Sequence, residues 1–130
     1  MNKQSLLIRT KNFSLRIIAL AEEMLKKKGV SRILADQILR SGTAVGANYR
    51  AACIAKSAKD FLNKLKICEE EADETVFWLD MLIESGTIRA ELLYNLRDEA
   101  SQLTAILTAS IKTKKLHMQK KDNFSEKASH

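Results

Sequence analysis

The stretch Arg40-Ser41-Gly42-Thr43-Ala44-Val45-Gly46-Ala47-Asn48-Tyr49-Arg50 decides the fold of this chain. Its two glycines and its short side chains are typical of a loop. The apolar residues on either side, however, recur at alternating steps of four and three, and this rhythm passes through the stretch without losing phase. We therefore predict a helix in which Gly42 and Gly46 let another helix approach closely, with a loop as the alternative.

The same spacing of apolar residues predicts four helices, at about residues 5–28, 31–55, 58–85 and 92–111. The chain has no proline, which agrees with long uninterrupted helices. Gly29 and Gly86 are suited to the turns, and Ser31 and Ser57 to N-caps. The predicted fold is all-α: an antiparallel up-down-up-down four-helix bundle over residues 1–112, followed by a basic, disordered C-terminal tail over residues 113–130.

Composition and length limit the classes of protein. At 130 residues the chain is long enough for one domain with a real core. Its first residues contain too short an apolar run for a signal peptide, and no segment is apolar enough to span a membrane. Two cysteines, Cys53 and Cys68, fit a reduced compartment better than a disulfide scaffold. We therefore expect a cytoplasmic protein without a membrane partner.

The net charge of +6 is unevenly distributed. Residues 1–56 carry a balance of +8, residues 57–111 a balance of −6 and residues 112–130 a balance of +4. Such separation favours self-association and attracts polyanions. No carboxylate precedes Glu22, so nucleic-acid contact is one interpretation of the first basic group and a solvated face is the other. The candidate nucleic-acid-binding residues are Lys3, Arg9, Lys11, Arg16, Lys26, Lys27 and Lys28.

No pattern of catalytic residues is present. The acidic run Glu69–Glu74 lacks the histidines that a di-iron bundle requires, because His117 and His130 both lie in the tail. Neither cysteine has a nearby histidine or a CxxC spacing. We therefore predict no enzyme activity, no metal and no cofactor, and we interpret the acidic run as a solvated or interfacial face.

Five side chains in and near the small-residue stretch are candidates for assembly. Asn48 falls on the predicted apolar stripe, where a buried amide can fix helix register, with ligand contact as the alternative. Tyr49 and Trp78 are candidate interface aromatics, and base stacking is a second interpretation of Tyr49. Arg40 and Arg50 are expected to pair between helices or subunits with the acids of the third helix, Glu70, Glu71 or Glu74, with phosphate binding as the alternative.

The stretch Arg40–Arg50 resembles the signature of the small bacterial four helix bundle proteins, also called S23 or 23S rRNA intervening-sequence proteins. The resemblance continues through Asp60-Phe61, Lys64–Ile67, Glu71–Thr75 and Trp78-Leu79, and covers about residues 13 to 107. Ala51 departs from the glutamate that the family usually has after the Tyr-Arg pair. The matched motif residues are Arg40, Gly42, Gly46, Asn48, Tyr49, Arg50, Glu71, Glu74 and Trp78.

The resemblance implies antiparallel helices that assemble into a ring-like homopentamer. It also implies kinship with the accessory variability protein of diversity-generating retroelements, which binds nucleic acid and a reverse transcriptase. The sequence therefore predicts a non-enzymatic, oligomeric scaffold that binds RNA, DNA or a protein partner such as a reverse transcriptase. The alternative is an assembly module with no nucleic-acid role.

Overall fold

The structure is a computed structural model that describes residues 1–128. This part of the chain forms four long α-helices and one short 3-10 helix, with no strand. They are α1 (Lys3–Leu25), α2 (Val30–Cys53), α3 (Ala58–Ser85), η1 (Ala90–Leu92) and α4 (Tyr94–Ala128). The predicted all-α four-helix fold is confirmed.

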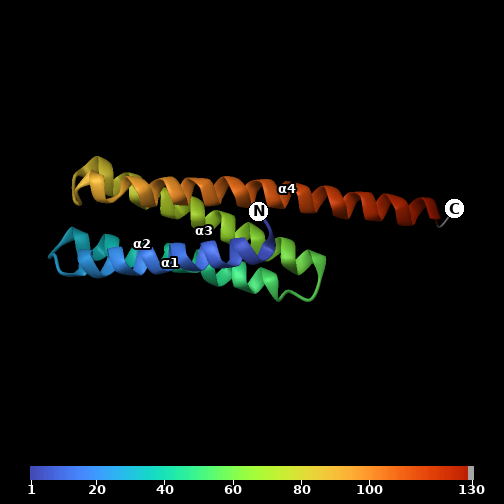
Figure 1. The fold of residues 1–130 in the computed structure, drawn as a ribbon, viewed down its shortest axis with the longest axis horizontal. Helices are drawn as coiled ribbons and strands as arrows, with labels where there is room; N and C mark the ends of the chain where they lie inside the picture. The colour runs from blue at the N-terminus through green and yellow to red at the C-terminus, as the bar shows by residue number, and fades with distance from the viewer. Residues whose placement is uncertain (129–130) are drawn as a thin grey trace.

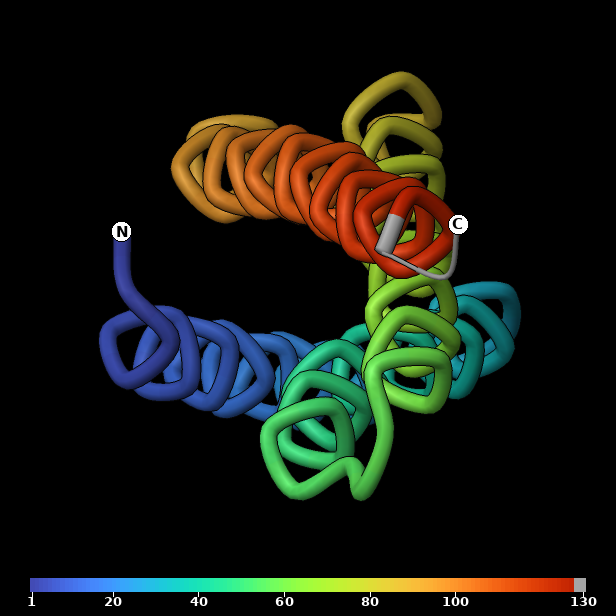
Figure 2. The backbone as a smooth tube through the Cα atoms, turned by 90° about the vertical axis from the view of Figure 1, so that its right-hand side faces the viewer, coloured from blue at the N-terminus to red at the C-terminus, as the bar shows by residue number. Residues whose placement is uncertain are grey.

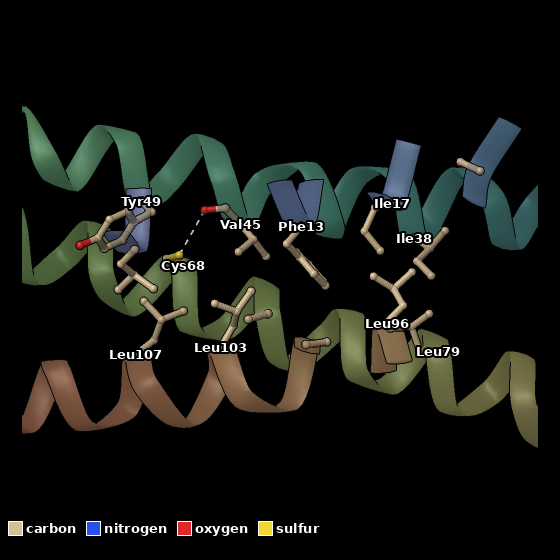
Figure 3. Packing of buried hydrophobic residues seen from close by; sticks show 14 of the residues in the cluster. Phe13, Ile17, Ile38, Val45, Tyr49, Cys68, Leu79, Leu96, Leu103 and Leu107 are labelled. Atoms are coloured by element: carbon tan, nitrogen blue, oxygen red, sulfur yellow. Dashed lines mark hydrogen bonds between the residues drawn. The ribbon is translucent and has the colours of Figure 1, made fainter. Parts of the chain in front are cut away.

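The helices run alternately up and down, and each packs against the next one along the chain (Figure 1). Contact between α1 and α4 is much sparser, and in the end-on view these two helices stand apart (Figure 2). A bidentate ion pair between Arg9 and Glu99 links them, and Arg9 Nε lies 2.8 Å from Glu99 Oε2. The core lies between the four helices and includes Phe13, Ile38, Leu79 and Leu103 (Figure 3).

The helix boundaries follow local capping chemistry. The Ser57 hydroxyl accepts a hydrogen bond of 3.0 Å from the Asp60 amide, so the predicted N-cap of α3 is confirmed. Gly86 ends α3 with a φ of 69°, a left-handed conformation that favours glycine. Gly29 also has a positive φ, but it stands immediately before α2, and Ser31 lies buried in the first turn instead of capping it.

The small-residue stretch is helical throughout and packs against α1. A Cβ placed on Gly42 would lie 2.5 Å from Ile17 Cγ2, and one on Gly46 would lie 2.7 Å from Ser14 Oγ. The Ser14 hydroxyl donates to the Gly42 carbonyl at 2.8 Å and accepts from the Gly46 amide at 3.1 Å. The helix with close backbone approach is therefore confirmed, and the loop alternative is excluded.

The predicted disorder of the tail is wrong for residues 113–128, where α4 continues as a helix to Ala128. Residues 129–130 lie outside the described part of the chain. The apolar phase of α4 extends further than expected, because Met118 lies seven residues after the buried Ile111 and packs against the core cluster. With 35 residues, α4 is about 52 Å long and projects well beyond the other helices (Figure 1).

The close approach of α1 and α2 predicts an unusual response to the substitution Gly42→Ala. Alanine is the better helix former by about 1 kcal/mol, so propensity alone would stabilise the fold. The added methyl group would overlap Ile17, and we expect net destabilisation of about 1–3 kcal/mol in urea unfolding. The substitution Ala47→Gly, at an exposed position of α2, measures how much the difference in helix propensity between alanine and glycine contributes without a steric clash. An increase in stability of Gly42→Ala would contradict the close contact.

Candidate nucleic-acid interface

The motif side chains Arg40, Glu71, Glu74 and Trp78 form one polar cluster across α2 and α3. The Arg40 guanidinium pairs with both carboxylates, at 3.2 Å from Glu71 Oε2 and closer still to Glu74 Oε2. The Trp78 indole N–H donates to Glu74 at 3.3 Å. The predicted interhelical pairing is thus confirmed for Arg40. Because Arg40 is half exposed, this cluster contributes only modestly to stability.

Arg50 forms no ion pair with any carboxylate of residues 1–128. It lies exposed at one end of a groove between α1 and α2, which also contains Lys11 and the exposed side chain of Leu15. This groove has a volume of about 550 Å³, and we call it the α1/α2 groove. It owes its depth to Gly46 and Ala47, whose missing or minimal side chains leave its floor unfilled.

Two predictions about the end of the small-residue stretch are wrong. Asn48 is only half buried, and its amide donates to the Ala44 carbonyl of its own helix at 2.9 Å. Tyr49 occupies the buried position instead, with 4% of its surface exposed, so its ring is unavailable for stacking or for a partner. The Tyr49 hydroxyl lies 3.5 Å from the Lys3 carbonyl, and burial raises the pKa of Tyr49 to about 12.

The two cysteines differ in exposure. Cys68 is fully buried and donates through its thiol to the Val45 carbonyl at 3.2 Å (Figure 3), as expected for a core residue. Burial is the main reason why the pKa of the Cys68 thiol rises to about 12. Cys53 is half buried. Among residues 1–128 no group of histidine, cysteine or acidic side chains has an arrangement that could hold a metal ion.

The predicted nucleic-acid-binding residues do not form one site. They are spread along α1 and the turn after it, so Lys3 and Lys26 lie about 35 Å apart. Arg9 is engaged by Glu99 and Gln102, and Lys26 pairs with Glu23. Lys27 donates to the Thr87 carbonyl at 3.3 Å. Lys11, Arg16 and Lys28 are exposed.

The antiparallel fold instead gathers basic residues at one end of the bundle, which we call the tail pole. Here α1 begins, α2 ends, α3 begins and α4 continues outward (Figure 1). Residues 1–5, 50–66 and 112–121 contribute eleven lysines and arginines and a single carboxylate, that of Asp60. The basic residues are Lys3, Arg50, Lys56, Lys59, Lys64, Lys66, Lys112, Lys114, Lys115, Lys120 and Lys121.

None of these eleven basic side chains forms an ion pair within the described residues. The opposite end, which we call the hairpin pole, contains the α1–α2 turn and the α3–α4 connection. Its segments, residues 22–32 and 84–98, carry six basic and five acidic residues. Arg89 and Arg97 there pair with Glu91 and Asp80. Within residues 1–128 the tail pole therefore carries a larger excess of basic side chains than the hairpin pole.

Sequence reasoning missed most of this surface, because its members come from three separate segments. The available signal was the scarcity of acids: residues 112–121 contain none, and residues 50–66 contain only Asp60. Their meeting at one end follows from the up-down topology, which brings the α2–α3 turn and the extended part of α4 to the same end of the bundle (Figure 1).

The fold and this surface define a small helical-bundle protein with one strongly basic pole. No helix within residues 1–128 is both long and apolar enough to cross a membrane. Residues 3–109 match the family of 23S rRNA-intervening sequence proteins, and the chain belongs to that family. The resemblance read from the sequence is thus confirmed at the level of the family.

A protein from Bacteroides thetaiotaomicron VPI-5482, solved as a crystal structure, has the same fold. It is a protein of unknown function from the S23 ribosomal protein family, 35% identical to this chain, with a TM-score of 0.78. The match covers 86% of this chain and 99% of that chain. No curated protein matches the chain. The family match ends at Ala109, so the last part of α4 lies beyond it.

The raised pKa values of Cys68 and Tyr49 predict loss of stability at alkaline pH. In the unfolded chain these groups lose their protons near their ordinary pKa values of 9.0 and 10.0, whereas in the folded chain they keep them until about pH 12. The unfolded state therefore binds fewer protons, and the free energy of unfolding falls as pH rises from about 9 to 12.

Urea unfolding at a series of pH values measures this effect. The double variant Cys68→Ala/Tyr49→Phe, compared with the unaltered protein, should show a shallower decline, because both titrating groups are gone. Equal slopes in the two proteins would show that these two buried groups are not responsible.

Proposed function

We propose that this protein is a non-enzymatic scaffold that binds nucleic acid through its tail pole. The observation that carries the proposal is the set of eleven basic side chains at that pole, none of which forms an ion pair among residues 1–128, although Glu69 borders a hollow with Lys112 and Lys115 and Asp122 follows Lys121. Like charges gathered in this way repel one another, and a polyanion relieves the repulsion while releasing its counterions. Phosphates of RNA or DNA meet this requirement without any catalytic group.

The helical tail supports the same proposal. Lys112, Lys115, Lys120 and Lys121 are all exposed on the part of α4 that follows the family match. A helix holds them at fixed spacing, so less conformational freedom is lost on binding than from a disordered tail. They extend the positive surface outward along the axis of α4 (Figure 1).

The test compares two basic clusters at opposite poles. A labelled structured RNA and a DNA duplex are titrated with the full chain at several salt concentrations, and binding is followed by fluorescence anisotropy. Neutralising four tail lysines in Lys112→Gln/Lys115→Gln/Lys120→Gln/Lys121→Gln should weaken binding at least tenfold. It should also reduce the slope of log K against log salt by about three, since each lost phosphate contact removes about 0.7–0.9.

The matched control is Lys26→Gln/Lys27→Gln/Lys28→Gln at the hairpin pole, which should leave the affinity within about twofold. Absence of binding by the unaltered protein at low salt would disprove a nucleic-acid role. An equal loss in both variants would disprove the assignment to the tail pole.

Self-association is a second candidate function, supported by apolar surface along α1. Ile8, Leu15, Ile18 and Leu25 share the outer face of α1 and are 39–53% exposed. Leu15 and Ile18 also line the α1/α2 groove, beside Lys11 and Arg50. Exposed apolar residues in this number favour a protein interface.

We propose a second copy of this chain as the occupant of the α1/α2 groove. The outer face of α3 is complementary in character, because Phe77 is 50% exposed and Met81 is 36% exposed on the same face as Glu70. When each copy uses one surface to contact a different surface of the next copy, the copies associate head-to-tail. They close into a ring if the rotation between neighbouring copies is a whole fraction of a full turn. A homopentamer, as the family resemblance implies, is one such ring. Binding of a reverse transcriptase stays a separate prediction.

The substitution Leu15→Glu places a charge in the groove and should convert the oligomer to a monomer. Light scattering after size exclusion measures the mass. Leu92→Glu, at a leucine of η1 that is 69% exposed, serves as the control and should leave the mass unchanged. A monomeric unaltered protein would disprove self-association. An oligomer that binds no nucleic acid would favour the pure assembly module.

A further inference from the structure

One hollow in the tail pole combines an aromatic ring with basic groups. It has a volume of about 440 Å³, within the range of small-molecule sites, and we call it the Phe61 pocket. Phe61 contributes one wall from the start of α3, and α4 contributes the facing wall. The α4 residues that matter most are Ile106, Ser110, Thr113, Lys114 and His117. All but Ile106 lie beyond the family match, which ends at Ala109.

Two ammonium groups converge on the Phe61 ring. Lys3 Nζ lies 5.4 Å from the ring centroid and Lys114 Nζ lies 5.3 Å from it, both within cation–π range. Neither lysine has a carboxylate partner among residues 1–128. The ring that lines the hollow therefore contacts two ammonium groups without carboxylate partners, Lys114 from the lining itself and Lys3 from α1, which suits a ligand with both an anionic and a planar apolar part.

We propose that the Phe61 pocket binds an unpaired nucleotide of a single-stranded nucleic acid, an inference that rests on the proposed nucleic-acid function. The base stacks on Phe61 in place of one ammonium group, and the flanking phosphates form ion pairs with Lys3 and Lys114. The exchange is favourable, because base stacking on an aromatic side chain exceeds an exposed cation–π contact. The released ammonium gains a phosphate partner in the same step.

The pocket distinguishes single strands from duplexes for a steric reason. In a duplex both faces of each internal base are covered by stacked neighbours, so only phosphates reach the protein. An unpaired base has a free face. The lysines of the tail pole therefore attract either form, whereas Phe61 adds affinity only for the single strand. The stacking is tolerant of sequence, because every base offers a face to the ring.

The test uses the full chain with a single-stranded oligonucleotide that contains 2-aminopurine, and with a duplex of equal length. Stacking quenches 2-aminopurine, so the unaltered protein should lower its fluorescence on binding. Phe61→Leu keeps an apolar side chain but removes the ring, and it should weaken single-strand binding about tenfold and leave duplex binding unchanged. Phe61→Tyr keeps a stacking surface and should retain the affinity.

Tyr94→Leu, which removes an exposed ring at the hairpin pole, is the matched control and should bind as the unaltered protein does. Unquenched 2-aminopurine, or equal single-strand affinity of Phe61→Leu and the unaltered protein, would overturn the pocket assignment even if salt-dependent binding to both forms persists. Failure of both nucleic acids to bind at low salt would overturn the proposed function as well. Circular dichroism of each variant verifies that the bundle is intact.

Discussion

The contact on which the rest of the structure depends is the close approach of α1 to α2 at Gly42 and Gly46. No side chain larger than hydrogen fits at either position without displacing Ile17 or Ser14. The Ser14 hydroxyl bridges the Gly42 carbonyl and the Gly46 amide, which fixes the register of the two helices. This register turns Phe13 and Ile17 into the core and leaves Leu15 and Ile18 outside. The exposed face of α1 and the α1/α2 groove are thus consequences of the same contact.

The antiparallel order of the helices then determines how charge is distributed. Segments that are far apart in the chain meet at the tail pole, and each brings lysines with few acids. Their mutual repulsion disfavours the folded state, and a fold selected for stability alone would place carboxylates among them. The polar cluster of Arg40 with Glu71 and Glu74 shows such compensation elsewhere on the surface. Its absence at the tail pole supports a role in binding.

The sequence predicted the helices well because apolar spacing and capping residues are local signals. The helical state of the small-residue stretch followed from the phase on either side of it, and the Ser57 cap from its own side chain. Asn48 and Tyr49 were assigned wrongly because the predicted stripe advanced by 3.5 residues per turn. A straight helix advances by 3.6, so the stripe drifts by about 20° per heptad. By the last turns of α2 that drift moves the buried position from Asn48 to Tyr49.

The tail pole could not be predicted from the linear sequence, because it depends on distances between segments. The net charge of +6 and the basic run on α1 both suggested a site on the first helix. Yet Lys3 and Lys26 are about 35 Å apart, whereas charges are screened over about 8 Å at physiological salt. Basic residues at the two poles therefore cannot act on one phosphate together. What attracts a polyanion is the local excess of charge within a few screening lengths, and of the two poles of the described chain the tail pole has such an excess, with none of its basic side chains in an ion pair.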